Sequence, residues 1–198
     1  MMDFFDRFHL INMSIFYFVF IGKTIQMILS GNNPFVLGTG KRGFRALFEI
    51  FLLIGFVIWT FEAFSICLGL KHHLFMDLPL FSIVPLRISG VVLEIAGLII
   101  FVSAIFSFGR SWRLGIDTKA AGKLVTGGVF SLTRNPIFLS VDLFFIGTFL
   151  IYPTIFFTIS TLVVIFSIHL QVVQEERFLE REYGDEYLEY KRQVRRYL

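Results

Sequence analysis

The chain has 198 residues, of which 56% are hydrophobic and 27 are Phe, and its mean hydropathy is +0.75. An ordinary soluble domain is about 45–50% apolar, and long apolar runs recur along this chain, which excludes a soluble domain with one anchor. We therefore expect one all-α, multi-pass membrane domain over residues 1–198, and the only cysteine, Cys67, excludes a disulfide framework and a cysteine-based metal site. No metal site is expected.

Five apolar segments are predicted to form membrane helices, judged against the roughly 20 residues that a span requires. They cover about residues 10–29, 44–70, 83–108, 137–152 and 153–173. The fourth would be only about 24 Å long, so it either spans a thinned bilayer or forms a hairpin with the fifth. Pro153 is suited to the first position of that returning helix. Residues 1–108 then hold the N-terminal membrane helices, and residues 109–198 form the second half.

The distribution of Lys and Arg predicts the orientation in the membrane. Basic residues gather at 41–45, 110–134 and 177–196, whereas the opposite side holds only Arg7, Lys71 and Arg87. The positive-inside rule therefore predicts an outside N-terminus and a cytoplasmic C-terminus. The net charge of +3 is mainly this topology signal, with attraction to anionic lipid headgroups second. Acids are interleaved with the basic residues, which argues against a nucleic-acid partner.

After residue 173 the chain becomes strongly charged. Aromatic and apolar residues recur along one helical face at Tyr183, Tyr187, Tyr190 and Val194. This pattern predicts a cytoplasmic amphipathic helix, which either lies on the membrane surface or folds back onto the ends of the bundle. Gly184 predicts a break, after which Asp185 can cap a second helix.

The stretch SLTRNPIFLS, residues 131–140, combines a helix start with an arginine. Asn135 is a good N-cap and Pro136 a good first helical residue. A helix N-terminus offers free N–H groups and partial positive charge, and Arg134 adds a full charge, so together they could bind an anion. The alternative is that Arg134 only meets lipid phosphate.

The stretch QVVQEERFLE places two carboxylates where the fifth helix is expected to leave the membrane. Glu175 and Glu176 could hold a cation or ribose hydroxyls, or act as a base. The alternative is a solvated surface paired with Arg177 and Arg181. His169 is predicted on the face of Glu176 and could act near the site, or it could be a packed histidine.

Three acids are predicted inside the membrane, where an ionisable side chain is costly and suggests a function. Asp142 lies about one turn beyond Phe138 and is nearest to the candidate site. For Glu62 and Glu94 we expect protonated side chains that are hydrogen-bonded to neighbouring helices.

The order of these motifs carries more information than each motif alone. KLVTGGVFSLTRNPIFLS, an apolar hairpin and QEERFLEREYGDEYLEYKRQVRRYL follow one another, and GRSWRLGID precedes them at residues 109–117. This order resembles the isoprenylcysteine carboxyl methyltransferase and phospholipid methyltransferase group of integral membrane enzymes, over about residues 109–198. The resemblance implies S-adenosylmethionine (SAM) bound from the cytoplasmic side, and a lipophilic acceptor that arrives from the bilayer.

The resemblance also implies roles for individual residues. The catalytic residues would be Arg134 and Glu176. The cofactor-binding residues would be Gly128, Arg134, Asn135, Pro136, His169, Glu175, Glu176 and Tyr187. The substrate-binding residues would be Phe138, Asp142 and Arg192. The carboxylate of SAM suits Arg134 and the helix N-terminus, and its cationic groups and ribose suit the two glutamates.

The acceptor and the reaction class stay open at this point. Asn135 stands where the prenylcysteine enzymes have histidine, so the acceptor could be an isoprenylcysteine-like carboxylate, a phospholipid amine or another lipid. An amine or hydroxyl would need a base, for which Glu176, Glu175, His169 and Asp142 are candidates. A membrane NADPH-dependent sterol-type reductase has a similar layout, although Glu-Glu argues against it. A non-enzymatic structural or lipid-binding membrane protein is the third interpretation.

Overall fold

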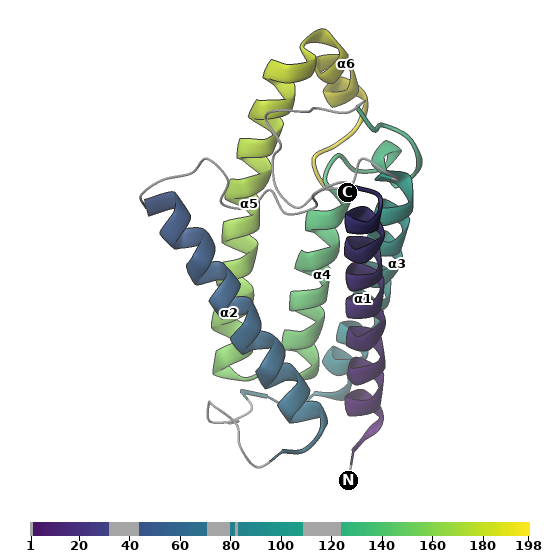
Figure 1. Ribbon diagram of the computed structural model, residues 1–198. Helices are drawn as coiled ribbons and strands as arrows, with labels where there is room; N and C mark the ends of the chain where they lie inside the picture. Colours follow the sequence, from purple (N-terminus) through teal and green to yellow (C-terminus); the bar gives the residue numbers. More distant parts are fainter. Residues whose placement is uncertain (1, 32–43, 71–79, 82, 109–123) are drawn as a thin grey trace.

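The computed structural model describes residues 2–31, 44–70, 80–81, 83–108 and 124–198. The GRSWRLGID stretch lies outside these residues. The described elements are α1 (Phe4–Leu29), α2 (Phe44–Cys67), α3 (Val84–Phe108), the 3₁₀ turn η2 (Gly128–Ser131), α4 (Pro136–Ile151), α5 (Ile155–Tyr183) and α6 (Asp185–Gln193). Figure 1 shows α1, α3, α4 and α5 side by side, α2 inclined to them, and α6 at the end where α5 finishes. The all-α prediction is confirmed.

The helices have the length and composition of membrane spans. α1, α3, α5 and residues 50–67 of α2 are long and apolar enough to cross a bilayer, and α4 is a shorter apolar helix of 16 residues. Large apolar side chains cover their outer surfaces, for example Phe18 and Phe106, which are each 79% exposed. Exposing this apolar surface to water would be unfavourable, whereas contact with lipid tails is not. The predicted membrane helix bundle is therefore confirmed. The direction of insertion stays a prediction.

Two helix boundaries differ from the prediction because polar residues extend the helices. α1 begins at Phe4, six residues early, because Asp3 and Asp6 form a reciprocal capping box with two 2.8 Å hydrogen bonds. α5 continues to Tyr183, ten residues past the predicted end, since charged residues are compatible with a helix. It stops at Gly184, which has a φ of +52° that favours glycine. Gly184 itself caps α6, and Asp185 lies in the first turn of α6, so its predicted capping role is wrong.

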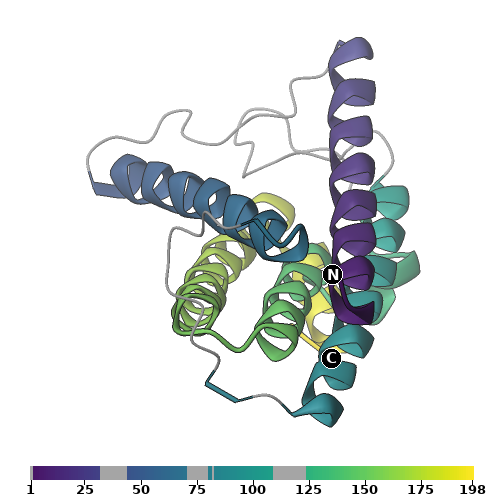
Figure 2. The ribbon, with the colours of Figure 1, turned by 90° about the horizontal axis from the view of Figure 1, so that it is seen from below.

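α4 and α5 form the predicted hairpin. Thr154, rather than Pro153, starts the return: it is the N-cap of α5, and its hydroxyl accepts a hydrogen bond from the Phe157 amide. Figure 2, seen from below, shows α4 and α5 next to each other with α2 lying across them. α6 folds back onto the bundle, because the Tyr190 hydroxyl donates a 2.6 Å hydrogen bond to the Phe130 carbonyl in η2. This contact decides between the two predicted placements of the amphipathic helix.

α3 and α4 pack closely because small residues face each other. A Cβ atom added to Gly147 would stand 2.6 Å from the Glu94 Cγ atom and 2.8 Å from the Gly90 carbonyl oxygen. A Cβ atom added to Gly97 would stand 2.9 Å from the Ser140 carbonyl oxygen. Such close backbone approach is typical of small residues at membrane helix interfaces. It fixes α4, and therefore the turn that precedes α4.

A buried polar cluster joins α1 to this pair of helices. Glu94 and His9 are fully buried, with 2.6 Å between the Glu94 Oε1 and His9 Nδ1 atoms. Asn12 donates to the other carboxylate oxygen at 3.1 Å, and the Thr148 hydroxyl donates to Oε1 at 3.1 Å. Glu94 is therefore hydrogen-bonded to neighbouring helices, as expected. Glu62 is also buried, on α2.

Candidate functional site

The turn before α4 carries Arg134, an arginine whose buried side chain forms most of its hydrogen bonds within the protein. The Arg134 side chain is 7% exposed. Its Nε and Nη2 atoms donate to Glu176 Oε1 at 3.1 and 2.9 Å, and its Nη1 atom donates to the carbonyls of Lys191 and Val194 at 3.1 and 2.6 Å. Four of the five N–H groups of this guanidinium are thus used, and the fifth has no acceptor among the residues that the structure describes.

Glu176 lies between two guanidinium groups. The side chain is 3% exposed, and its Oε2 atom accepts hydrogen bonds from Arg196 Nε and Nη2 at 3.1 and 2.7 Å. Hydrogen bonds to Glu176 raise the pKa of Arg196 above its usual value. Because both carboxylate oxygens are charge-paired, the carboxylate of Glu176 is satisfied inside the protein, and removing either arginine would leave it partly uncompensated.

Asn135 and Pro136 occupy the predicted N-cap and first helical positions of α4. The Asn135 side chain does not cap the helix, however. Its Nδ2 atom donates to Glu176 Oε1 at 3.3 Å and to the Arg196 carbonyl at 3.2 Å. Within the described part of the chain no side chain caps this terminus, so its first amide groups can donate to another acceptor.

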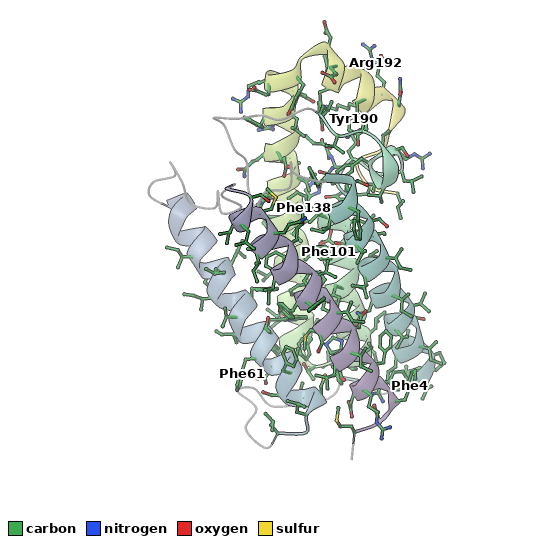
Figure 3. All side chains as sticks on the ribbon, turned by 45° about the vertical axis from the view of Figure 1, so that its right-hand side comes forward. Phe4, Phe61, Phe101, Phe138, Tyr190 and Arg192 are labelled. Atoms are coloured by element: carbon green, nitrogen blue, oxygen red, sulfur yellow. The ribbon has the colours of Figure 1, made fainter. Side chains whose placement is uncertain are left out.

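A cavity of about 620 Å³ lies beside this turn, walled by residues of α1, α2, α3, η2, α4 and α5. Arg134, Asn135, Gln171 and Glu175 line one end. The rest is largely aromatic, with Phe16, Tyr17, Phe20, Phe56, Trp59, Phe101, Phe108, Phe130, Phe138, Phe144 and Phe145. Figure 3 shows Phe138 and Phe101 among the helices, below Tyr190 and Arg192. Along α4 the aromatic lining reaches about 15 Å from Asn135 to Phe145, so the cavity is polar at one end and apolar along its length.

Glu175 is the carboxylate that reaches this cavity. It lines the polar end, and within the described part of the chain it forms no hydrogen bond and no ion pair. Adjacent residues on a helix point about 100° apart. Glu176 therefore faces the two arginines while Glu175 faces the cavity, and an unpaired carboxylate in apolar surroundings favours a cationic ligand.

Two predicted site residues lie on another side of α4 and α5. His169 is exposed, and its Nδ1 atom is 3.3 Å from the Tyr197 hydroxyl. Asp142 is half-buried. It lies near Tyr197, and the burial of the Tyr197 hydroxyl together with the charge of Asp142 raises the pKa of Tyr197. Neither His169 nor Asp142 lines the cavity. His169 is exposed while Glu176 is buried, so the two side chains have different surroundings, and a role of His169 near the site stays a prediction.

Three further predicted residues are also outside the cavity lining. Gly128 has a φ of +63°, and a Cβ atom there would stand 2.5 Å from the Ser107 hydroxyl oxygen, so packing against α3 explains the glycine. Tyr187 is 1% exposed, and burial together with the nearby Glu176 raises the pKa of its hydroxyl. Arg192 is 76% exposed and pairs with Glu189 at 3.1 Å, at the outer end seen in Figure 3. Arg192 thus lies apart from the cavity lining, and its predicted substrate contact stays a prediction.

Sequence reasoning did not select Arg196, Gln171 or Trp59 as site residues. The basic chain end was part of the family pattern, and that was the available signal for Arg196. No sequence signal marked Gln171 or Trp59, because glutamine and aromatic residues recur throughout the membrane helices.

Comparison with known proteins gives one match. The family model described as phospholipid methyltransferase matches residues 86–186, which is just over half of the chain. This range includes most of α3, all of α4 and α5, and the turn that carries Arg134. No curated protein and no solved structure matches the chain significantly.

Proposed function

Because the chain belongs to the phospholipid methyltransferase family, we propose that this membrane protein is a SAM-dependent methyltransferase with a lipophilic acceptor. The observation that carries the proposal is the unpaired Glu175 at the polar end of an otherwise aromatic cavity. A cavity of about 620 Å³ is within the roughly 300–1,000 Å³ of small-molecule sites.

The polar end suits both charges of the cofactor's amino-acid part. Glu175 would hold a cationic group, and the α4 N-terminus with the remaining N–H group of Arg134 would hold the carboxylate. The aromatic rings add favourable cation–π contacts for a sulfonium and keep water out. Phe138, the one predicted substrate contact that lines the cavity, would meet the acceptor.

The reaction requires alignment more than acid–base chemistry. When bound, SAM would supply an electrophilic methyl group on a positively charged sulfur, and the electron pair of the methyl–sulfur bond would stay on sulfur as the methyl group passed to the acceptor's lone pair. The residues of this chain would hold the two reactants in line, which is the main source of rate in such a step. If the acceptor is an amine or hydroxyl, its proton must also leave, and Glu175 is the carboxylate in the described cavity lining that could accept it.

An NADPH-dependent reductase fits these charges less well. Arg134 is the one cationic side chain among the described cavity-lining residues, and Glu176 already pairs with it. An unpaired carboxylate would repel the phosphates of NADPH. A purely lipid-binding protein would gain nothing from a carboxylate whose burial is costly. The cavity therefore favours a cationic cofactor, and the positive-inside rule supports its entry from the cytoplasm.

The adjacent glutamates allow a matched test by calorimetry on detergent-purified protein. Glu175→Gln removes the charge that faces the cavity, so we expect folded protein with SAM affinity lowered about tenfold, since a charged hydrogen bond contributes about 1.5–3 kcal/mol. Glu176→Gln makes the same change one residue away at a side chain that does not line the cavity, so we expect it to lower thermal stability and to weaken SAM binding only indirectly, through the loss of order around Arg134. Wild-type protein that binds NADPH but not SAM would contradict the proposal, as would unchanged SAM affinity in Glu175→Gln.

A further inference from the structure

The residues that follow α6 return to the turn before α4. We call Val194 to Tyr197 the strap. Val194 is extended, with φ −121° and ψ 137°, and the chain then runs back from α6 toward the start of α4 (Figure 1). This path brings the end of the chain onto the polar end of the cavity.

Main-chain atoms of the strap are bonded to three consecutive residues of that turn. The Arg134 amide donates to the Arg195 carbonyl at 2.9 Å. The Thr133 hydroxyl and the side-chain Nδ2 atom of Asn135 donate to the Arg196 carbonyl at 3.0 and 3.2 Å. Thr133 and Asn135 are 1% and 6% exposed, so these bonds are shielded from water. The strap is therefore built into the site.

The Arg196 side chain completes the ion cluster from the outside. It donates to Glu176 Oε2 while Arg134 donates to Glu176 Oε1. The Arg196 side chain is 36% exposed and does not line the cavity, so it acts through Glu176. Without Arg196, the Oε2 atom of this buried carboxylate loses its charged partner, and Glu176 is held only through Oε1, by Arg134 and Asn135. Arg134 would then lose a fixed partner as well.

We propose that the strap completes the cofactor site and that Arg196 is a positioning residue for methyl transfer, holding Glu176 so that Arg134 stays at the polar end of the cavity. This inference rests on the proposed function. It assigns the two glutamates different roles: Glu175 faces the ligand, and Glu176 orders the residues around it. Loss of Arg196 should then weaken SAM binding although no contact to SAM is removed.

The test compares Arg196→Ala, Arg196→Lys and Arg195→Ala in the full chain. Arg195 is the matched control, because it loses the same charge on the same segment while its exposed side chain forms no ion pair within the described residues. Hydrogen exchange of the Arg134 amide and the strap amides reports docking, and calorimetry reports SAM affinity. For Arg196→Ala we expect faster exchange and about tenfold weaker SAM binding. Arg196→Lys should recover part of both, and Arg195→Ala should change neither.

The outcomes separate this inference from the proposed function. If Arg196→Ala speeds exchange but binds SAM like wild type, the positioning role is refuted and the methyltransferase proposal stands. If exchange is unchanged in Arg196→Ala, the strap is not held by this side chain. Wild-type protein without SAM affinity would refute the proposed function and the positioning role together. Should Arg196→Ala fail to fold, Arg196→Lys decides, because it keeps the charge and loses the forked geometry.

Discussion

Gly147→Ala tests the contact that sets the position of α4. The added Cβ atom would stand 2.6 Å from the Glu94 Cγ atom, 2.8 Å from the Gly90 carbonyl oxygen and 3.2 Å from the Glu94 amide nitrogen. Two of these atoms belong to the backbone of α3 and cannot move alone. The third belongs to a side chain that accepts hydrogen bonds from Asn12 and Thr148. α3 and α4 must therefore separate.

The magnitude follows from two opposing terms. Overpacking typically costs about 1–3 kcal/mol, and the cost here should be near the upper end because backbone atoms are involved. Replacing a helical glycine by alanine returns about 1 kcal/mol through helix propensity. We expect a net loss of about 2 kcal/mol, which corresponds to a fall in melting temperature of roughly 4–8 °C for a chain of this size.

Thermal unfolding of detergent-purified protein, followed by circular dichroism, measures this change. Gly55→Ala is the matched control: Gly55 lies in the helix α2, and a Cβ atom there has nothing within 4 Å. It should be neutral or slightly stabilising. If Gly147→Ala melted at or above the wild-type temperature while Gly55→Ala behaved as expected, the close packing of α3 and α4 would be wrong.

Two more predictions concern buried polar groups. Glu94→Ala removes the acceptor of the Asn12 and Thr148 hydrogen bonds and the partner of His9, so it should lower the free energy of unfolding by about 3–5 kcal/mol, against about 1 kcal/mol for Thr148→Val in the same melting assay. Equal losses would argue against the cluster. Burial raises the pKa of Tyr190 from 10.0 to about 12, so the folded protein keeps a proton that the unfolded chain loses. Stability should therefore fall as pH rises from about 10 to about 12, and less steeply in Tyr190→Phe; identical slopes would contradict this.

Local signals predicted local features of the fold well. The start of α4 was placed correctly because an N-cap position followed by proline is a property of a few adjacent residues. The break at Gly184 was found for the same reason. The start of α1 was missed because Asp3 and Asp6 were excluded from an apolar span, although together they cap its helix. Hydropathy shows which part of a helix is apolar, whereas hydrogen bonds at the caps set the residues at which the helix begins and ends.

In the candidate site, too, the sequence identified residues and the tertiary structure decided their surroundings. Sequence reasoning named Arg134 and both glutamates as cofactor-binding, and it gave the catalytic role to Glu176 rather than to Glu175. Only the folded chain shows that Glu176 is enclosed by Arg134 and Arg196 while Glu175 lines the cavity. His169 shares a helical face with Glu176, yet it is exposed, because periodicity gives a direction around one helix and says nothing of what covers it.

The sequence by itself determined that this is a helical membrane protein with an arginine at a helix start and a carboxylate pair at the end of the next apolar segment. These features depend on composition, helical period and neighbouring residues, all of which are local. The tertiary structure decided which carboxylate is free, how the strap closes over the turn before α4, and which aromatic rings from α1, α2 and α3 wall the cavity. Those outcomes depend on contacts between residues that lie far apart in the chain, such as Arg134 with Glu176 and His9 with Glu94, and no local pattern specifies such pairs.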